Sequence, residues 1–530
     1  MEVQNMSLEQ KIGQMFICGF DGLQPTKEIE TLITKYHIGG IIYFRRNISS
    51  VDQVHRLSGS LQQLAKKNSN VPLFISLDQE GGMVNRIDQG VTFFPGNMAL
   101  GATGNPDIAY QAAYISGSEL RVLGINMNLA PCLDINNNPD NPVIGVRSFG
   151  DEAKFVGNMG TAMVDGYQAA NVSAVIKHFP GHGDTQVDSH LSLPEITHSL
   201  NRLKEIELVP FKQAIEHGVD AVMTAHIMFP SVEPDRKPST LSNKIITGLL
   251  REELNFDGVV VTDCLEMNAI SEEFGIDKGA VLAIDAGADV ILVSHLFERQ
   301  VMAYDAVLKA VQEGRISEER INESVERILK LKEKRYIGQI EKNFESVKSK
   351  IGIDSHQKIA QEMTQKCVTL VKDDTHQLPL DTSLKTLVIW PEERLTSPVD
   401  DVGKQEASLG EILKNSILSL VEYKIHSDPC KEEIHQLLER SSIFKQIVVV
   451  TYNAKSSPKQ MELVKMLVER CEKMKTRLIT VAIRTPYDIQ AYPEVKTFLA
   501  CYENRPMMIE ALAKVLVGEE QAVGKCPVKL

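Results

Sequence analysis

The densest group of chemically active side chains lies between Lys177 and His190. This short segment holds three histidines, two aspartates and a lysine, together with two glycines and a proline. Ionisable groups are seldom buried for packing alone, and catalytic groups often sit on loops held by a rigid scaffold. The segment is therefore predicted to carry function, and two kinds of chemistry fit its composition.

The first kind is metal binding. Imidazole and carboxylate groups are common zinc ligands, although the spacing here matches no standard zinc pattern. The available ligands are His178, His182, Asp184, His190 and His226. The second kind is acid/base catalysis by Asp188 and His190, because a carboxylate orients an imidazole and favours its protonated form. Such a histidine can protonate a leaving group and later accept a proton from water.

A second candidate position is Asp263, which ends the β-branched run 259–262. A carboxylate at the end of a buried strand is expected to face the mouth of the fold. The alternative is that Asp263 caps the next helix, with Glu266 completing a capping box. Cys264 adjoins no obvious base and is predicted to serve packing.

Two further segments carry groups suited to binding hydroxyl-rich ligands. Asp78 precedes Gln-Glu-Gly-Gly, and the two glycines allow a ligand to approach the backbone closely. A carboxylate accepts hydrogen bonds from two hydroxyl groups, and Arg86 adds donors. Arg147 follows an Asn-rich turn and is the fourth candidate, although a lone arginine is more often a surface charge.

Eight short apolar runs, alternating with helical patterns, must position these groups. They are residues 12–20, 38–44, 72–78, 125–131, 172–178, 221–226, 258–263 and 288–293. Such runs are typical of parallel strands that are buried on both faces. Eight in about 300 residues predict a (β/α)8 TIM-type barrel in preference to an open sheet. Four of them end in an ionisable group, as expected where a barrel builds its active site.

The alternation of apolar runs and helical patterns stops after a predicted helix over residues 317–334. It restarts beyond a charged, weakly periodic stretch. Strands are predicted at 368–371, 386–390, 446–450 and 478–483. The sequence therefore predicts a catalytic barrel over 1–335, a linker over 336–354 and a smaller, sandwich-like α/β domain over 355–530. This domain lacks a Gly-rich phosphate loop, so it gives little support to nucleotide binding.

Composition excludes several classes of protein. The 530 residues are 43% hydrophobic and carry a net charge of −13, which argues against disorder and against a general nucleic-acid binder. No apolar stretch is long enough for a membrane span, and no signal peptide is visible, although removal of a leader would leave the same sequence. Eight dispersed cysteines favour free thiols in a reducing compartment, so a cytoplasmic location is expected.

Taken together, the four segments resemble glycoside hydrolase family 3, in particular its bacterial β-N-acetylglucosaminidase branch. The string KHFPGHGDTQVDSH over 177–190 is highly specific, and the segments DQEGG and VTDCLEM follow the family order. The likeness is strong over residues 7–335 and looser beyond them, through 359–372 and 524–528. One departure is Met83, which stands where an arginine is usual and puts a charged contact beside the sugar in doubt.

The resemblance implies a retaining hydrolase that releases terminal β-linked N-acetylglucosamine and needs no cofactor or metal. In this reading Asp263 is the nucleophile, and His190, tuned by Asp188, is the acid/base. The sugar would be held by Asp78, Arg86, Arg147, Lys177 and His178. A second Asp-Ser-His triplet, at 354–356, opens a helix and is predicted to be an N-cap without catalytic role.

Several alternatives stay open at this stage. A β-glucosidase is the main rival within the family, and phosphorolysis is possible because a histidine repels an anionic acceptor less than a carboxylate does. A metal-dependent hydrolase on the same barrel is the alternative from another class. The sequence also leaves open whether the substrate is a peptidoglycan fragment, a glycopeptide or a chitin oligomer, and what the oligomeric state is.

Overall fold

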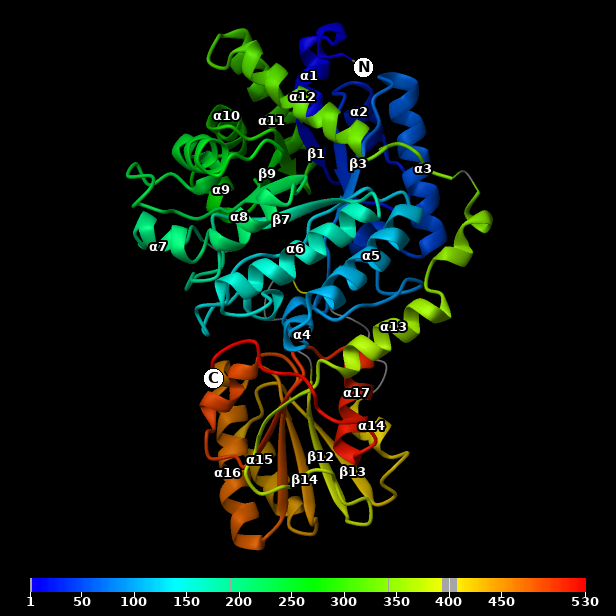
Figure 1. Ribbon diagram of the computed structural model, residues 1–530, viewed down its shortest axis with the longest axis vertical. Helices are drawn as coiled ribbons and strands as arrows, with labels where there is room; N and C mark the ends of the chain where they lie inside the picture. The colour runs from blue at the N-terminus through cyan, green and yellow to red at the C-terminus, as the bar shows by residue number, and fades with distance from the viewer. Residues whose placement is uncertain (1, 190–191, 342, 393–399, 401–407) are drawn as a thin grey trace.

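The computed structural model describes residues 2–189, 192–341, 343–392, 400 and 408–530. Two bodies lie along the long axis of the molecule, a larger one formed by the N-terminal part and a smaller one formed by the C-terminal part (Figure 1). His190, the predicted acid/base, lies outside the described residues. The division of the chain at residues 335 and 355 stays a prediction.

The larger body is a closed barrel of eight parallel strands, as predicted. The order around the barrel is β1-β10-β9-β8-β7-β6-β3-β2. The strands are β1 (Phe16–Cys18), β2 (Gly40–Ile42), β3 (Phe74–Leu77), β6 (Met127–Asn128), β7 (Ser173–Phe179), β8 (Ala221–Thr224), β9 (Val259–Cys264) and β10 (Val290–Val293). A two-stranded ribbon, β4 (Gln79–Gly81) with β5 (Val84–Asn85), follows β3.

The first strand is shorter than predicted, because the apolar residues near Ile12 belong to helix α1 (Leu8–Gln14). Ser7 caps this helix: its hydroxyl accepts a hydrogen bond from Gln10 N, and the Gln10 side chain accepts one from Ser7 N. This capping box sets the start of the helix, and the strand begins only at Phe16.

Helices surround the barrel (Figure 1). They include α2 (Lys27–Thr34), α3 (Val51–Asn68), α5 (Pro106–Val122), α6 (Ala153–Ala169), α7 (Leu200–Glu205), α8 (Val209–Glu216), α10 (Ile276–Ala286) and α11 (Phe297–Gln312). The predicted helix over 317–334 is α12 (Glu318–Lys334), and Ser317 caps it by accepting a hydrogen bond from Arg320 N. Among the helices of the described ranges, none has the length and apolar character that crossing a bilayer requires.

The smaller body is built on a six-stranded sheet in the order β11-β16-β15-β14-β12-β13. Its strands are β11 (Thr369–Asp373), β12 (Thr386–Pro391), β13 (Leu420–Ile425), β14 (Gln446–Thr451), β15 (Arg477–Ala482) and β16 (Thr497–Ala500). All neighbours are parallel except β11 and β16. The four predicted strands are present, whereas β13 and β16 were not predicted. The helices are α13 (Asp354–Gln365), α14 (Leu409–Leu413), α15 (Lys431–Ser441), α16 (Pro458–Met474) and α17 (Pro506–Val517).

The second Asp-Ser-His triplet does not cap a helix as predicted. Ile353 occupies the N-cap position of α13, and Asp354 is already the first helical residue. His356 instead faces the barrel, where its Nδ1 lies 2.7 Å from Oε1 of buried Glu119 on α5. The triplet therefore ties α13 to the barrel.

The two bodies meet at a buried contact around Glu503. Its Oε2 accepts a hydrogen bond of 2.8 Å from Gly96 N of the barrel. Arg505 donates from Nε to Gly82 O at 3.0 Å. The end of the chain adds a second tie, since Lys525 N donates to Ala102 O at 2.8 Å and Lys529 N donates to the Asp151 carboxylate at 2.8 Å.

This contact predicts a pH dependence of stability. Burial raises the pKa of Glu503 from its ordinary value near 4.5 to about 7, against the lowering effects of Gly96 N and the Arg505 charge. The folded state thus keeps a proton that the unfolded state has lost, and stability falls as pH rises from about 4.5 to about 7. We expect the fall to amount to a few kcal/mol.

Replacing Glu503 by glutamine tests this expectation. The amide oxygen of Glu503→Gln can still accept from Gly96 N but has no charge to bury. In urea titrations at pH 5 and pH 8, the variant should lose less free energy of unfolding between the two values than the parent chain. Parallel losses in the two proteins would show that Glu503 does not set this dependence.

Candidate active site

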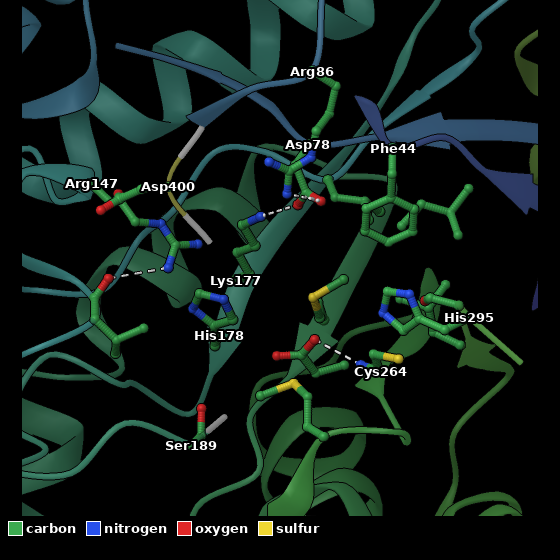
Figure 2. Close-up of a pocket in the computed structure, with 18 of the residues that line it drawn as sticks. Phe44, Asp78, Arg86, Arg147, Lys177, His178, Ser189, Cys264, His295 and Asp400 are labelled. Carbon is green, nitrogen blue, oxygen red and sulfur yellow. Dashed lines mark hydrogen bonds and ion pairs between the residues drawn. The ribbon is translucent and has the colours of Figure 1, made fainter. Parts of the chain in front are cut away.

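A cavity of about 470 Å³ opens at the carboxyl ends of the barrel strands (Figure 2). Every binding residue that the sequence predicts lines it, and so does the predicted nucleophile: Asp78, Arg86, Arg147, Lys177, His178 and Asp263. Asp78 directly follows β3, and Lys177 and Asp263 lie near the carboxyl ends of β7 and β9. The barrel therefore brings together groups that are far apart in the sequence, as strand ends in this fold do.

Five charged side chains form a row beside the cavity, which we call the charge row: Arg86, Asp78, Lys177, Glu80 and Arg147. All of them line the cavity except Glu80, which is buried behind it. Arg86 Nη2 lies 3.2 Å from Asp78 Oδ2, and Lys177 Nζ lies 2.8 Å from Asp78 Oδ1 and 2.7 Å from Glu80 Oε1. Arg147 completes the row by donating from Nε and Nη2 to the two Glu80 oxygens at 3.0 and 2.8 Å. Signs alternate along the row, so each buried charge lies beside an opposite one.

This alternation fixes the protonation state of the row. Burial alone would raise the pKa of the Asp78 carboxyl, but the charges of Lys177 and Arg86 lower it overall. Burial likewise opposes ionisation of Glu80, and the charges of Arg147 and Lys177 hold its pKa well below the ordinary value. The pKa of Lys177 is raised, because Asp78 and Glu80 outweigh the effect of its burial. All five groups are therefore charged near neutral pH.

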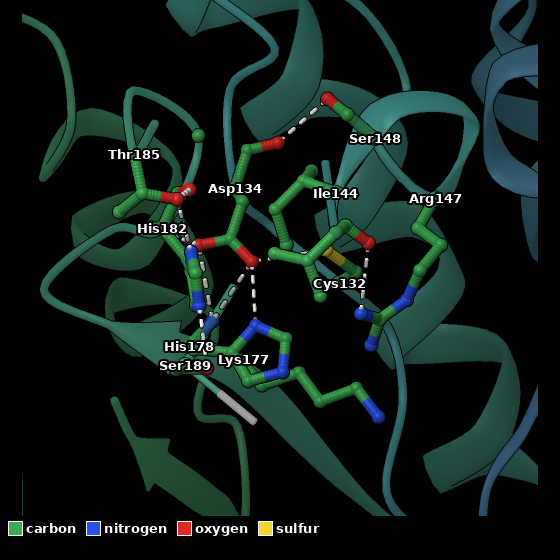
Figure 3. A network of polar contacts seen from close by, with 12 residues as sticks. Cys132, Asp134, Ile144, Arg147, Ser148, Lys177, His178, His182, Thr185 and Ser189 are labelled. Carbon is green, nitrogen blue, oxygen red and sulfur yellow. Dashed lines mark hydrogen bonds and ion pairs between the residues drawn. The ribbon is translucent and has the colours of Figure 1, made fainter. Parts of the chain in front are cut away.

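His178 is held by a carboxylate that the sequence did not single out. Asp134 Oδ2 lies 2.6 Å from His178 Nδ1, and Asp134 also accepts hydrogen bonds from the backbone N–H groups of His178 and His182 (Figure 3). Burial opposes its ionisation, yet His178 holds the pKa of Asp134 well below its ordinary value. An ionised Asp134 assigns the Nδ1 proton to His178 and leaves Nε2 to interact with a ligand.

Asp263 is the second-last residue of strand β9 and lines the cavity. Its Oδ1 accepts a hydrogen bond of 2.7 Å from Cys264 N. The alternative of a helix cap is wrong, because Met267 is the N-cap residue of the next helix, α9 (Asn268–Ser271). Glu266 does not complete a capping box either. It accepts from the backbone N–H groups of residues 294–296, which follow β10.

The segment before His190 is packed against the same cavity. Asp188 is buried, and its neighbour Ser189 lines the cavity wall. Ser189 Oγ lies 3.0 Å from Nε2 of His182, whose Nδ1 lies 2.9 Å from Thr185 Oγ1. Burial and the nearby His178 lower the pKa of His182 to about 4, so this imidazole is neutral near pH 7.

The residues proposed as metal ligands do not converge in the part of the chain that the structure describes. Both ring nitrogens of His182 are engaged as above, and those of His226 face Thr240 Oγ1 at 2.8 Å and Cys264 O at 3.0 Å. Asp184 pairs with His198 at 2.6 Å. Cys132, Asp134 and His178 do lie together, but only His178 among them belongs to the proposed ligands.

Several lining residues were missed by sequence reasoning. Phe44 follows β2, and its ring centre lies 5.1 Å from that of His295, which follows β10. Arg46 also lines the cavity, and its guanidinium carbon lies 4.3 Å from the Phe44 ring centre. Asp400 comes from the smaller body and pairs with Arg484 there. Phe44 could have been found from its position at the end of a predicted strand. Nothing in the sequence around Asp400 marks it as a residue of the site.

Met83 does not line this cavity. Its side chain is buried and packs in the hydrophobic cluster of the smaller body, with Met98, Ala99 and Val146 of the barrel. It lines a separate, very small cavity together with Glu503. Met83 therefore belongs to the contact between the two bodies.

Comparison with known proteins agrees with this geometry. Residues 7–331 match the family model described as the glycosyl hydrolase family 3 N terminal domain. The chain is 51% identical to a solved glycoside hydrolase family 3 β-N-acetylglucosaminidase from Paenibacillus sp. str. FPU-7, with 99% of each chain covered and a TM-score of 0.94.

Two curated relatives are also similar over nearly the whole chain. "Beta-hexosaminidase A" of Pseudoalteromonas piscicida is 32% identical, with 94% of this chain and 90% of the relative covered. "Beta-N-acetylglucosaminidase/beta-glucosidase" of Cellulomonas fimi is 27% identical over 99% of this chain and 94% of its own. On these grounds, the chain belongs to glycoside hydrolase family 3 and is a glycoside hydrolase.

Proposed function

We propose that this glycoside hydrolase is a retaining, exo-acting β-N-acetylglucosaminidase that removes the terminal non-reducing sugar from oligosaccharides or glycopeptides. The observation that carries the proposal is the placement of Asp263, which lines the same cavity as His178 and four members of the charge row. The names of the two relatives that align over nearly the whole chain, and that of the Paenibacillus structure, support the choice of sugar.

In the proposed first step the hydroxyl and N-acetyl groups of the sugar are held by Asp78, Arg86, Arg147, Lys177 and His178. The Asp263 carboxylate attacks the anomeric carbon, and His190 gives a proton to the departing oxygen. The products of this step are a covalent glycosyl-aspartate and a free alcohol. In the second step His190 accepts a proton from water, the hydroxyl attacks the anomeric carbon, and Asp263 is released as a carboxylate. Asp188, buried two residues before His190, orients the imidazole.

A panel of aryl β-glycosides tests the proposal. The N-acetylglucosaminide should be cleaved with a far higher kcat/KM than the glucoside or the xyloside. A preference for the glucoside would instead favour the β-glucosidase alternative, to which the double name of the Cellulomonas relative gives some support. Adding phosphate and looking for the sugar 1-phosphate among the products separates phosphorolysis from hydrolysis.

Metal removal gives an independent prediction. Because the proposed mechanism uses only Asp263, His190 and Asp188, exhaustive chelation should leave kcat/KM on the aryl N-acetylglucosaminide unchanged. The measurement compares chelator-dialysed protein with the same protein supplied with Zn²⁺. Loss of activity on dialysis followed by recovery with Zn²⁺ would contradict the roles given to Asp188 and His190.

We also propose a cytoplasmic location, with a peptidoglycan- or chitin-derived fragment as the substrate. All eight cysteines are free, and six of them are buried. Free thiols in this number suit a reducing compartment better than an oxidising one.

A further inference from the structure

A cysteine, a glutamate and a histidine that the proposed mechanism does not use meet at the active-site cavity. One ligand atom from each of Cys264, Glu266 and His295 lies within 4.8 Å of the other two. Cys264 is the last residue of β9, Glu266 lies between β9 and α9, and His295 follows β10. Figure 2 shows the Cys264 sulfur beside the His295 ring. We call these three residues the thiol cluster.

The ligand set of the thiol cluster favours a zinc-like ion. Thiolate and imidazole groups bind Zn²⁺ and copper well, whereas Mg²⁺ and Ca²⁺ prefer oxygen ligands. Bonds of about 2.0–2.3 Å place the ligand atoms of a tetrahedral zinc site roughly 3.5 Å apart, so the cluster needs to contract by about 1 Å. The exposed side chain of His295 can supply this movement by rotation.

Glu266 is held ready as a ligand. Its two carboxylate oxygens accept hydrogen bonds of 2.6 to 3.0 Å from the backbone N–H groups of residues 294–296. Oε1 takes only one of these bonds, so it keeps a lone pair for a cation. Of the two arginines nearby, Arg46 pairs with Asp21 at 2.5 Å, and Arg299 is partly exposed at 4.0 Å from Glu266. Repulsion of a bound cation is therefore screened.

Ser294 adds a buried hydroxyl at the same place. Its side chain lines the cavity, and its Oγ makes no hydrogen bond of ordinary geometry within the part of the chain that the structure describes. Buried hydroxyl groups in this state are uncommon. Oγ lies close enough to Cys264 to favour the thiolate form. Donation to a metal-bound thiolate would satisfy this hydroxyl, as outer partners of metal ligands do.

The proton balance of binding follows from the state of each ligand. Burial, and then the charge of Glu266, raises the pKa of the Cys264 thiol to about 12, against the lowering effect of Ser294. The thiol proton therefore passes to solvent when the metal–sulfur bond forms. Desolvation lowers the pKa of His295, so its neutral imidazole offers a nitrogen lone pair near pH 7. A divalent ion on one thiolate and one carboxylate leaves no net charge at the site.

An ion at the thiol cluster lies beside the proposed nucleophile. Cys264 and His295 both line the cavity, and exposure of His295 gives an entry path from solvent. The Cys264 backbone N–H also donates to Asp263 Oδ1 at 2.7 Å. A cation here stabilises the Asp263 carboxylate, which makes it a weaker nucleophile, and takes up space that the sugar needs. Both effects oppose hydrolysis.

We propose that the thiol cluster binds one divalent ion of the Zn²⁺ class and that the bound ion inhibits the enzyme. Binding does not depend on the proposed function, whereas inhibition rests on it, because it is measured on the proposed substrate. The role is the reverse of that in a metal-dependent hydrolase. Chelation should leave activity unchanged, and added Zn²⁺ should lower it.

Two variants and one control test the inference. Cys264→Ser replaces the sulfur by a weaker oxygen ligand of similar size. His295→Ala removes the imidazole from an exposed position, so it should fold even if a change at buried Cys264 does not. Cys430→Ser, at an exposed cysteine of the smaller body, is the control. Because Cys264 and His295 line the cavity, each variant is compared with itself, with and without metal.

Metal binding is measured directly. Calorimetric titration of the chelator-dialysed parent chain with Zn²⁺ should show one site per chain. Cys264→Ser and His295→Ala should each weaken binding by at least about tenfold, since even the outer partners of metal ligands are worth roughly 10- to 100-fold in affinity. One equivalent of Cd²⁺ should give a thiolate-to-metal absorption band in the ultraviolet, which Cys264→Ser should lack. Cys430→Ser should keep both the Zn²⁺ site and the band.

Activity on the nitrophenyl N-acetylglucosaminide gives the second readout. In the parent chain kcat/KM should be lost as the calorimetric site fills, and the Zn²⁺ concentration that halves it should match the dissociation constant. That concentration should rise in Cys264→Ser and His295→Ala by the same factor as the dissociation constant. Mg²⁺ at equal concentration should have no effect.

The binding site would be refuted by the absence of a saturable Zn²⁺ site, by unchanged affinity in either variant, or by a Cd²⁺ band that persists in Cys264→Ser. A Zn²⁺ site that fills without loss of activity would refute the inhibition. A parent chain that does not cleave the nitrophenyl N-acetylglucosaminide in metal-free buffer refutes the proposed function instead, and the calorimetric and spectral measurements still decide whether the thiol cluster binds metal.

Discussion

Asp263→Asn should lower kcat/KM on every β-N-acetylglucosaminide by roughly 10⁴-fold or more, the scale seen when a covalent nucleophile is removed. Asparagine has nearly the same shape and can still accept the hydrogen bond that Cys264 N donates to Asp263. The fold should therefore persist while the amide fails to form the glycosyl ester. The loss should be as large for nitrophenyl substrates as for sugars, because no leaving group relieves the need for a nucleophile.

A slow fluorosugar substrate gives the direct measurement. It should accumulate as a covalent adduct, and peptide mapping by mass spectrometry should place the label on Asp263 alone. Asp257→Asn, an exposed carboxylate just before the same strand, is the matched control and should retain activity and labelling. A label on Glu266 or on a carboxylate of the smaller body would refute the assignment.

His190→Ala should separate substrates by their leaving groups. General-acid assistance of this kind contributes roughly 10²–10⁴-fold, and a sugar hydroxyl needs it whereas a nitrophenolate does not. The variant should form the glycosyl-enzyme rapidly from the nitrophenyl substrate and then stall, because no base activates water. A burst of nitrophenolate followed by slow turnover is the expected time course.

Added azide should restore turnover of His190→Ala, since azide attacks without giving up a proton, and the product should be the β-glycosyl azide. Asp188→Ala should show a milder form of the same behaviour, because the imidazole remains but is less well oriented. His198→Ala is the matched control, since that histidine pairs with Asp184 in the adjoining segment. Equal losses on all leaving groups, with no response to azide, would make His190 a binding residue.

The sequence was a good guide to the residues at strand ends. Asp78, Lys177 and Asp263 each stand at the end of an apolar run, and a closed barrel necessarily brings such ends to one mouth. Run length was a weaker guide. The N-terminal part of the first predicted strand belongs to helix α1. In so short a segment, the spacing of apolar residues does not distinguish the buried face of a helix from a buried strand.

The residues that hold the site together could not be predicted in this way. Glu80 matters because it lies between Lys177 and Arg147, and Asp134 matters because it holds His178. These partners are 44 to 97 residues apart in the chain, so no local spacing marks them. Asp400 reaches the cavity from the other body, and only the packing of the two bodies places it there.

The charge row has a consequence for how this site can be altered. Each inner member touches two opposite charges, so a single replacement leaves a neighbour ionised and buried without its partner, which is a costly state. Effects of changes at touching positions are then strongly non-additive. A library that varies Asp78, Glu80 and Lys177 one at a time should yield mostly inactive proteins, whereas functional sequences should appear when adjoining members change together. The members of the charge row are therefore expected to change together or not at all. New sugar specificities should be reached more readily by substitutions at Phe44 and His295, which also line the cavity.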